Sequence, residues 1–329
     1  LFQLVCILAR MFQTLTPSIT HRAVPVVPVS WTAPVAPTDG PTTPAFVRFA
    51  ARSARTLPDA AYDALVDLGD DLDGVGAVVL RGLPVGRVPA TPPHPAAPTD
   101  KDTTSELTLL TVARLLGQPV GYLPEHGGDL VQNIVPTSSD VARQTSTSSR
   151  VQLAFHTETA FHPHKPRFLV LLCLKGDPAA STTLCSIDDI LPGLDTRQRQ
   201  VLAEPRFHTR ADESFGGGVD ARFLPPMRVL TGDPDHPTLT FDAELTTGLD
   251  DEAQAALDAL TALVETHHTS LVLEAGDLLV VDNHRCVHGR SPFAARFDGT
   301  DRWLQRSFVV ADLSASADDR VGRIITTTF

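Results

Sequence analysis

The second half of the chain consists of short runs of β-forming residues, and this pattern constrains the fold more than any other feature. From residue 129 onward, segments rich in Val, Leu, Phe and Thr alternate with turns rich in Gly, Pro and Asp. The runs are DLVQNIV, RFLVLLCL, STTLCSI, TLTFDAEL, SLVLEAGDLLVVDN and RWLQRSFVV. Many short strands in one stretch are typical of a β-sandwich or barrel. One helix is predicted among them, over residues 250–268, with acidic residues at its start and histidines at its end.

The first half of the chain is predicted to be mainly helical after an extended arm. Residues 17–44 are rich in Pro, Thr and Val, which favours an extended segment. The elements that follow are helices over 45–55 and 58–72, a buried strand over 76–85, a Pro- and Thr-rich loop over 86–104 and a helix over 105–117 that Gly117 ends. We therefore expect an arm over 1–44 and a single domain over 45–329, with its β core spanning about 129–312.

Charge and cysteine content bear on partners and location. The chain of 329 residues has 27 Lys and Arg against 39 Asp and Glu, a net charge of −12. An acidic surface repels phosphate, so neither nucleic acid nor an anionic membrane is expected as a partner. No run of about 18 uncharged apolar residues predicts a membrane span. The cysteines form no CxxC pair, and a reducing cytoplasm is expected; they are Cys6, Cys173, Cys185 and Cys286.

The first ten residues, LFQLVCILAR, are apolar but do not resemble a signal peptide. They have neither a basic segment nor a small-residue cleavage site. We therefore expect the natural start at Met11, with the preceding residues as an upstream extension.

The strongest local motif is His156-Thr157-Glu158. Side chains alternate between the two faces of a strand, so His156 and Glu158 can reach one metal ion together. The best candidate for a third ligand is His288, in DNHRCVHGRSPF. Two imidazoles and one carboxylate on one face of an octahedron form the facial triad of non-haem Fe(II) oxygenases. The open positions of such a site can take a bidentate 2-oxo acid and dioxygen.

Other interpretations of these residues stay open at this point. A His–Glu pair two residues apart also occurs on ordinary surfaces, and zinc accepts two His and one Glu as well. His284 and His288 have helical spacing, but the preceding LLVVDN is β-like. His162 and His164 lie two residues apart, yet the neighbouring prolines favour a loop, so we interpret both as structural or rim residues.

Arg302 favours the iron interpretation. It lies fourteen residues after His288, and strand alternation places Arg302 and Arg306 on one face of RWLQRSFVV. A 2-oxo acid needs a cation at its far end, and a guanidinium group offers a carboxylate two parallel hydrogen bonds. The alternative for Arg302 is a surface ion pair with Asp298 or Asp301.

With these residues assembled, the chain resembles the clavaminate-synthase-like branch of the Fe(II)/2-oxoglutarate oxygenases, which includes hydroxylases of free arginine, asparagine and lysine. The similarity runs from about residue 75 to residue 329, in the blocks HTETAFHPHKPRF, CLKGDPAASTTL, GDLLVVDNHRCVHGRSPFAARFDGTDRWLQRSFVVADLSAS and GRIITTTF. The last two blocks, with ADESF at 211–215, look closest to the L-lysine hydroxylases. The resemblance implies an α+β fold with a double-stranded β-helix (jelly-roll) core, flanking N-terminal helices and an inserted helix.

The resemblance also implies the cofactors and the residues that hold them. Fe(II) would be bound by His156, Glu158 and His288. The co-substrates would be 2-oxoglutarate and O2, with Arg302 on the distal carboxylate and Thr183 assisting it. The residues implied for substrate binding are Arg306 at the α-carboxylate, Ser146 at the amino-acid head, Asp242 at the far end with Glu244 assisting, Glu125 near the amine, and Glu158 beside the metal.

Several of these residues could instead have purely structural roles. Ser146 lies in QTSTSS, where any of several hydroxyl groups could be the contact, and Asp242 could cap a turn. Thr183 could be an ordinary strand residue next to Thr182.

The activity implied is hydroxylation of an unactivated C–H bond, at C3 or C4, of a free L-amino acid, giving the hydroxy-amino acid, succinate and CO2. A buried carboxylate at Asp242 favours a cationic partner, hence L-lysine or L-arginine. Glu158 is present where related halogenases have a small residue, which favours hydroxylation. The alternatives are an oxidative cyclase or desaturase acting on a biosynthetic intermediate, a hydroxylase of asparagine or of a carrier-bound amino acid, a zinc hydrolase, and a jelly-roll protein that only binds. The oligomeric state is not predicted.

Overall fold

The computed structural model describes residues 19, 22–70, 74–215 and 224–329. Cys6, the start expected at Met11 and the end of the helix predicted over 58–72 lie outside these residues. Residues 22–43 contain no helix, as predicted, and β1 (Val26–Pro28) pairs in parallel with β2 (Ala77–Arg81).

The helices of the first half lie where hydrophobic periodicity predicts them. They are α2 (Pro44–Ser53), α3 (Asp59–Asp70) and α4 (Thr104–Leu116), and α4 stops at Gly117. The Thr43 side chain caps α2 by accepting a hydrogen bond from the Phe46 N–H at 3.2 Å. Short 3-10 helices are η1 (Ala54–Thr56), η2 (His126–Gly128), η3 (Leu191–Gly193), η4 (Glu213–Phe215) and η5 (Ser314–Asp319).

Two sheets form the centre of the described structure. The larger, nine-stranded sheet has the order β1, β2, β13 (Leu278–Asp282), β6 (Phe168–Lys175), β15 (Trp303–Val310), β3 (Gln118–Tyr122), β17 (Ile324–Ile325) and β16 (Arg320–Val321), with β4 (Gln132–Ile134) also paired to β15. The smaller sheet has the order β12 (Thr269–Leu271), β7 (Thr182–Ser186), β14 (Cys286–Arg290) and β5 (Leu153–His156). Two antiparallel pairs complete the strands: β9 (Leu230–Gly232) with β10 (Pro237–Leu239), and β8 (Phe207–Thr209) with β11 (Thr246–Gly248).

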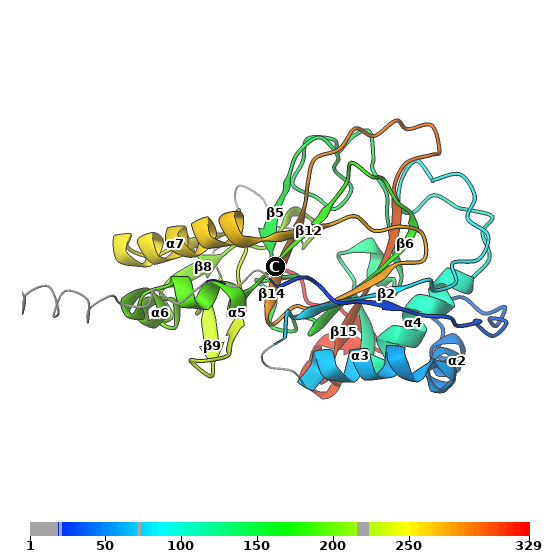
Figure 1. The fold of residues 1–329 in the computed structure, drawn as a ribbon, viewed down its shortest axis with the longest axis horizontal. Helices are drawn as coiled ribbons and strands as arrows, with labels where there is room; N and C mark the ends of the chain where they lie inside the picture. Colours follow the sequence, from blue (N-terminus) through cyan, green and yellow to red (C-terminus); the bar gives the residue numbers. More distant parts are fainter. Residues whose placement is uncertain (1–18, 20–21, 71–73, 216–223) are drawn as a thin grey trace, which may run out of the picture.

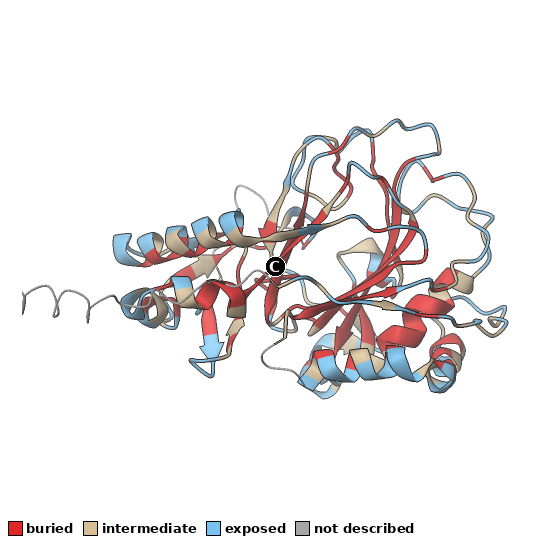
Figure 2. Cartoon of the chain, viewed as in Figure 1, coloured by how far each residue is buried: buried red, intermediate tan, exposed pale blue. Residues whose placement is uncertain are grey.

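Strand alternation divides the large sheet's side chains between two cores. On β6, Val170 and Leu172 pack in the cluster that contains residues of α3 and α4. The alternate residues Leu169 and Leu171 pack in the cluster that contains Leu184 of the small sheet. Both faces of β6 are therefore buried, which explains its uninterrupted apolar sequence. Figures 1 and 2 show these helices beneath the sheet, with buried strands above them.

A third core covers the outer face of the small sheet. Phe155, Cys185 and Val287 from its strands pack with apolar residues of α5 (Ile187–Ile190), α6 (Thr196–Leu202) and α7 (Asp251–His267). The helix predicted over 250–268 is α7, and the Asp250 side chain caps it by accepting a hydrogen bond from the Ala253 N–H. The molecule is thus layered as helices, large sheet, small sheet and helices (Figure 1).

Two predicted strands differ from the observed ones. SLVLEAGDLLVVDN forms two strands in different sheets, β12 and β13, because the chain turns at Gly276, which has a φ of +88°. Of the segment TLTFDAEL, only the first two residues belong to a strand, because β10 ends at Leu239. The Asp242 carboxylate then accepts hydrogen bonds from the N–H groups of Glu244 and Leu245, a local pattern that competes with sheet pairing.

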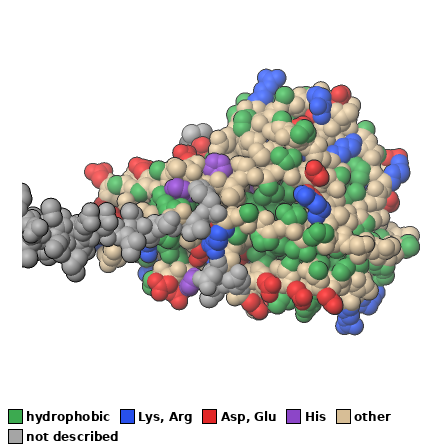
Figure 3. All heavy atoms as spheres, viewed as in Figure 1, with side chains coloured by type: hydrophobic (Ala, Val, Ile, Leu, Met, Phe, Trp, Pro, Cys, Tyr) green, Lys and Arg blue, Asp and Glu red, His purple; other side chains and the backbone are tan. Residues whose placement is uncertain are grey.

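The described surface agrees with the acidic composition. On the face drawn in Figure 3, Lys and Arg side chains stand singly among acidic and neutral ones, and acidic groups gather along the lower edge. None of the described helices has the length and apolar character needed to cross a membrane. Cys173, Cys185 and Cys286 are buried free thiols.

Candidate metal centre

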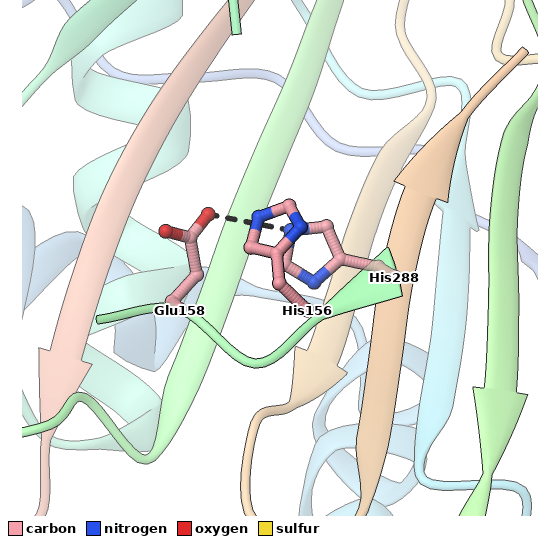
Figure 4. Close-up of side chains that lie close together, drawn as sticks. All are labelled: His156, Glu158 and His288. Atoms are coloured by element: carbon pink, nitrogen blue, oxygen red, sulfur yellow. Dashed lines mark ion pairs between the residues drawn. The ribbon is translucent and has the colours of Figure 1, made fainter. Parts of the chain in front are cut away.

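His156, Glu158 and His288 converge on one point between the two sheets. His156 ends β5, and His288 lies opposite it on the antiparallel strand β14. One ligand atom from each of the three side chains lies within 4.8 Å of the others, and Glu158 Oε1 is 3.3 Å from His288 Nε2. Figure 4 shows the three side chains pointing toward one another. His284 is not part of this group.

The donor set fits an iron-type cation. The Nδ1 of His156 donates a hydrogen bond to the Ala154 carbonyl oxygen at 2.8 Å, which leaves Nε2 available to a metal. The Nδ1 of His288 is buried and finds no hydrogen-bond partner among the described residues. Metal–ligand bonds of about 2.1 Å place neighbouring ligand atoms about 3 Å apart, close to the observed Glu158–His288 separation. Two imidazoles and a carboxylate are the facial set of non-haem iron sites.

Asn283 fixes the backbone of Glu158, and sequence reasoning did not identify this role. Its side-chain oxygen accepts a hydrogen bond from the Glu158 N–H at 2.6 Å. Its amide nitrogen donates to the carbonyl oxygens of Glu158 at 3.2 Å and Pro166 at 3.0 Å. Asn283 is 1% exposed and follows β13 directly, on the turn that leads to His288. A buried amide at the end of an apolar strand is the only sequence signal for it.

Arg306 supplies the positive charge beside the carboxylate ligand. Its Nη1 is 3.3 Å from Glu158 Oε1, and its guanidinium group also pairs with Glu125 and bonds to the Gln132 side-chain oxygen. Burial opposes the charge on Glu158, but Arg306 and the two histidines outweigh burial and hold the pKa of Glu158 below its usual range. Burial and His156 lower the pKa of His288. An ionised carboxylate and neutral imidazoles are the states that a metal ion requires.

The centre opens into a cavity of about 890 Å³ between the sheets. All but one of the site residues predicted from the sequence line it, including the far-end pair Asp242 and Glu244. The lining residues from that set are Glu125, Ser146, His156, Glu158, Asp242, Glu244, His288, Arg302 and Arg306. The tip of the Pro-rich loop, at residues 94–96, also lines the cavity. Segments far apart in the sequence therefore share one site.

Thr183 is the exception, and its neighbour Thr182 lines the cavity instead. On β7, Leu184 faces the core between the sheets whereas Cys185 packs in the outer core. Alternation therefore turns Thr182 inward and Thr183 outward. The Nη2 of Arg302 donates to Thr182 Oγ1 at 3.4 Å, while Thr183 Oγ1 is buried without a partner among the described residues. Thr182, rather than Thr183, therefore lies beside Arg302 in the cavity.

Arg302 is buried and forms no ion pair with any described residue. The surface ion pair of Arg302 with Asp298 or Asp301 is therefore wrong as a prediction. Both carboxylates instead accept hydrogen bonds within the local turn. Asp301 accepts hydrogen bonds from backbone N–H groups at 2.6 and 2.7 Å, and Asp298 accepts from Thr300. Burial lowers the pKa of Arg302. A buried guanidinium group in a cavity is suited to an anionic ligand.

His162 and His164 have structural roles, as predicted. The His162 ring packs edge-on against Tyr122 and Phe215, and its Nδ1 accepts a hydrogen bond from the His164 N–H at 2.9 Å. His164 Nε2 lies 2.7 Å from Asp319 Oδ2. Neither ring belongs to the three-residue metal group.

Comparisons with known proteins agree with this site. Residues 38–308 match the family described as Taurine catabolism dioxygenase TauD, TfdA family. The L-lysine 3-hydroxylase of Catenulispora acidiphila is 36% identical over 261 residues, covering 77% of this chain and 73% of that protein. The crystal structure of asparagine oxygenase with Fe(II), 2S,3S-3-hydroxyasparagine and succinate matches with a TM-score of 0.83 at 35% identity, over 88% of this chain and 92% of that chain.

A second solved structure extends the comparison to the co-substrate. The non-heme iron oxygenase OrfP in complex with Fe and α-ketoglutaric acid matches with a TM-score of 0.78 at 35% identity, over 86% of this chain and 91% of that chain. The family match spans most of the chain, and the lysine hydroxylase shares more than a third of the aligned residues. The chain therefore belongs to the TauD/TfdA family of dioxygenases.

Proposed function

We propose that the protein is an Fe(II)- and 2-oxoglutarate-dependent hydroxylase of a free basic L-amino acid, L-lysine or L-arginine, acting at C3 or C4. The observation that carries this proposal is that the triad of His156, Glu158 and His288 opens onto the same cavity as Arg302, which is buried and has no ion-pair partner in the described part of the chain. The similarity to amino-acid oxygenases with iron, succinate or α-ketoglutaric acid bound supports it.

The finer fold assignment is part of the same proposal. We infer that the large and small sheets are the two halves of a double-stranded β-helix, with the metal centre between them. The layering of the sheets around a shared core supports this assignment. Because the cavity is lined by residues from His94 to Arg306, we also propose that residues 45–329 work as one catalytic domain.

Bound iron, with 2-oxoglutarate and O2, would supply the oxidation that replaces C–H with C–OH and releases succinate and CO2. His156, Glu158 and His288 would hold the ion on one face and leave the opposite face to ligands. Arg302 would bind the distal carboxylate with Thr182 beside it. This pair is buried, so its charge-assisted hydrogen bonds are stronger than they would be in water.

The remaining polar residues would hold the amino acid at both ends. Arg306 would bind the α-carboxylate, while Glu125 and Ser146 would bind the α-ammonium group. Gln132 accepts hydrogen bonds from Arg306 at 2.9 and 2.6 Å, which keeps the guanidinium group in place without a competing charge. Holding both ends determines which carbon faces the metal, and such positioning is the protein's main contribution to this chemistry.

The far end of the cavity favours a cationic side chain. Burial raises the pKa of Asp242, so its ionised form needs a positive partner. Asp212 and Glu244 line the same cavity, and the negative charge of Asp212 also raises the pKa of Asp242. Glu213 lines the cavity as well but is paired with Arg143. A terminal ammonium or guanidinium group would satisfy Asp242 better than an amide or an aliphatic chain.

We also propose a reducing, cytoplasmic location and no macromolecular partner. The buried free thiols of Cys173, Cys185 and Cys286 support a reducing compartment. The net charge of −12 opposes binding to phosphate-rich partners.

The test is incubation of purified protein with Fe(II), ascorbate, 2-oxoglutarate and O2 against each free proteinogenic L-amino acid. Succinate formation and a mass gain of one oxygen are measured in each tube. We expect both with L-lysine or L-arginine. Succinate without an oxygenated amino acid would contradict the substrate class, and a product that loses two hydrogens would indicate the desaturase or cyclase alternative. No succinate from iron-loaded protein would contradict 2-oxoglutarate use.

A variant at the far end separates substrate choice from catalysis. Asp242→Asn should lower kcat/KM for the basic amino acid about 10- to 100-fold, since a buried charge-assisted contact contributes about 1.5–3 kcal/mol. Asp258→Asn is the matched control, because Asp258 is an exposed carboxylate on α7 outside the cavity. Equal kcat/KM values for wild type and Asp242→Asn would show that Asp242 only caps its turn.

A further inference from the structure

The cavity contains a second buried arginine, Arg290, which neither the sequence motifs nor the comparisons assign to a role. Arg290 lies two residues after His288 on β14, so both side chains face the cavity. Its exposed fraction is 3%, against 7% for Arg302. Among the described residues, no carboxylate forms an ion pair with either arginine. Two buried cations without an ion-pair partner among the described residues cost folding free energy, which indicates that an anionic ligand binds beside them.

Both arginines lie beside Thr182. The register between β14 and β7 places Arg290 directly opposite Thr182, and Arg302 Nη2 reaches Thr182 Oγ1 at 3.4 Å. Burial, together with the charge of Arg302, lowers the pKa of Arg290 to about 10. Arg290, Arg302 and Thr182 are called the cationic end of the cavity below. It is the region in which a second negative charge on a 2-oxo acid would be most strongly attracted.

Arg290 is also bonded to the loop of residues 145–149, which contains Ser146. Its Nη2 donates to Ser148 Oγ at 2.7 Å, and its Nη1 lies 3.5 Å from the Ser149 carbonyl oxygen. The guanidinium group stacks on the Phe293 ring, 5.0 Å from the centroid, and the Phe293 N–H bonds to the same Ser149 oxygen at 2.7 Å. The Nε of Arg290 is buried without a partner among the described residues. One side chain therefore joins the cationic end to the loop that lines the amino-acid side.

We propose that Arg290 is a positioning residue with two separable roles. Its charge acts with Arg302 to hold the distal carboxylate of a dicarboxylic 2-oxo acid. Its hydrogen bonds hold the 145–149 loop in the place where the amino-acid head binds. The inference rests on the proposed function, and it adds a residue that serves the co-substrate and the substrate together.

Four variants separate the two roles. Arg290→Gln removes both the charge and the planar set of guanidinium N–H donors, whereas Arg290→Lys keeps the charge but loses that set of donors. Ser148→Ala removes the contact with Arg290, together with the hydrogen bond from Ser148 Oγ to the Thr145 carbonyl oxygen at 2.8 Å, and leaves the charge of Arg290 untouched. Arg296→Gln is the matched control, because the Arg296 side chain is 54% exposed and lies outside the cavity.

Two measurements are made on each variant after circular dichroism shows that it is folded. The first is an anaerobic titration of the Fe(II)-loaded protein with 2-oxoglutarate, followed by the visible charge-transfer absorption of the complex. This titration is independent of turnover. The second is the KM for L-lysine or L-arginine, whichever is hydroxylated, together with the ratio of hydroxylated product to succinate.

We expect Arg290→Gln to weaken 2-oxoglutarate binding about tenfold and to raise the amino-acid KM as well. Arg290→Lys should stay within about threefold of wild type in 2-oxoglutarate binding but raise the amino-acid KM and lower the product-to-succinate ratio. Ser148→Ala should raise only the amino-acid KM, about three- to tenfold. Arg296→Gln should change neither measurement.

Unchanged 2-oxoglutarate binding in Arg290→Gln would overturn the electrostatic role. An unchanged amino-acid KM in both Ser148→Ala and Arg290→Lys would overturn the loop role. If Arg290→Gln does not fold, the Lys and Ala variants still decide the loop role, and 2-oxoglutarate binding much more than threefold weaker in Arg290→Lys would contradict the charge role. Failure of the wild-type protein to bind 2-oxoglutarate would instead contradict the proposed function itself, so the two failures are distinguishable.

Discussion

Replacing Asn283 with alanine should weaken iron binding without touching a metal ligand. The substitution removes three buried hydrogen bonds, from the Glu158 N–H and to the carbonyl oxygens of Glu158 and Pro166. All three backbone groups then lack their side-chain partner in a place that water reaches poorly, since Asn283 is 1% exposed. The Glu158 backbone is the part of the triad that loses its support.

The expected loss of unfolding free energy follows from those three backbone groups. A buried polar group left without a partner costs about 1–3 kcal/mol, so the low end of the sum is about 3 kcal/mol of unfolding free energy. At about 2.1 cal/mol/K of unfolding entropy per residue, that loss lowers the Tm of a 329-residue chain by about 4 °C. Loss of a residue that orients a metal ligand typically weakens metal affinity about 10- to 100-fold.

Iron affinity is measured anaerobically by competition with a chromophoric chelator, and Tm by calorimetry of the metal-free protein. Asn133→Ala is the matched control, because the Asn133 side chain also donates to a backbone carbonyl, that of Pro95 at 3.2 Å, and accepts from Trp303. It should lower Tm and leave iron affinity unchanged. Asn283→Asp keeps one acceptor but turns a carboxylate toward two carbonyl oxygens, so it should bind iron no better than Asn283→Ala. Wild-type iron affinity in Asn283→Ala would refute the reasoning.

Three further predictions test the cavity. Thr182→Val should raise the KM for 2-oxoglutarate about three- to tenfold, because it removes the hydroxyl group that accepts from Arg302. Thr183→Val should leave that KM unchanged and keep or raise Tm, because Thr183 Oγ1 is buried without a partner among the described residues. Burial raises the pKa of Glu125 to about 7 despite the neighbouring Arg306. Its carboxylate therefore forms as pH rises, and the amino-acid KM should fall between about pH 6 and about pH 8 in wild type but not in Glu125→Gln. Finally, adding Fe(II) at about 100 times its Kd should stabilise the folded protein by about 2.7 kcal/mol, and Glu158→Ala should remove most of this gain in a calorimetric scan.

The Glu125 prediction also has a stability counterpart with a definite sign. A folded-state pKa above the ordinary value of 4.5 means that the folded protein holds the proton more tightly than the unfolded chain. The associated stability is complete below about pH 4.5 and is lost as pH rises toward about 7. Glu125→Gln should therefore flatten the pH dependence of Tm across that window, and an unaltered slope would contradict the raised pKa.

Local periodicity alone was enough to predict several features of this protein. Alternation depends only on residues two positions apart, so it predicted that His156 would face the same way as Glu158, and Arg302 as Arg306, before any pairing is known. All four side chains line the cavity, although β5 ends at His156 and Glu158 lies beyond the strand. The helices α2, α3, α4 and α7 follow from apolar spacing and end signals within the same segments. The motif spacing then led to the family, which the comparisons confirmed.

Other features depend on which strands pair and in what register, and no local pattern contains that information. SLVLEAGDLLVVDN divides between two sheets, and the register of β7 against β14 turns Thr182 rather than Thr183 inward. The contact between Asn283 and Glu158 joins residues 125 positions apart, and that between Arg290 and Ser148 joins residues 142 apart. Such contacts form only when strands distant in the chain are brought together, so tertiary structure alone decided how the metal ligands are supported and how the two ends of the cavity are joined.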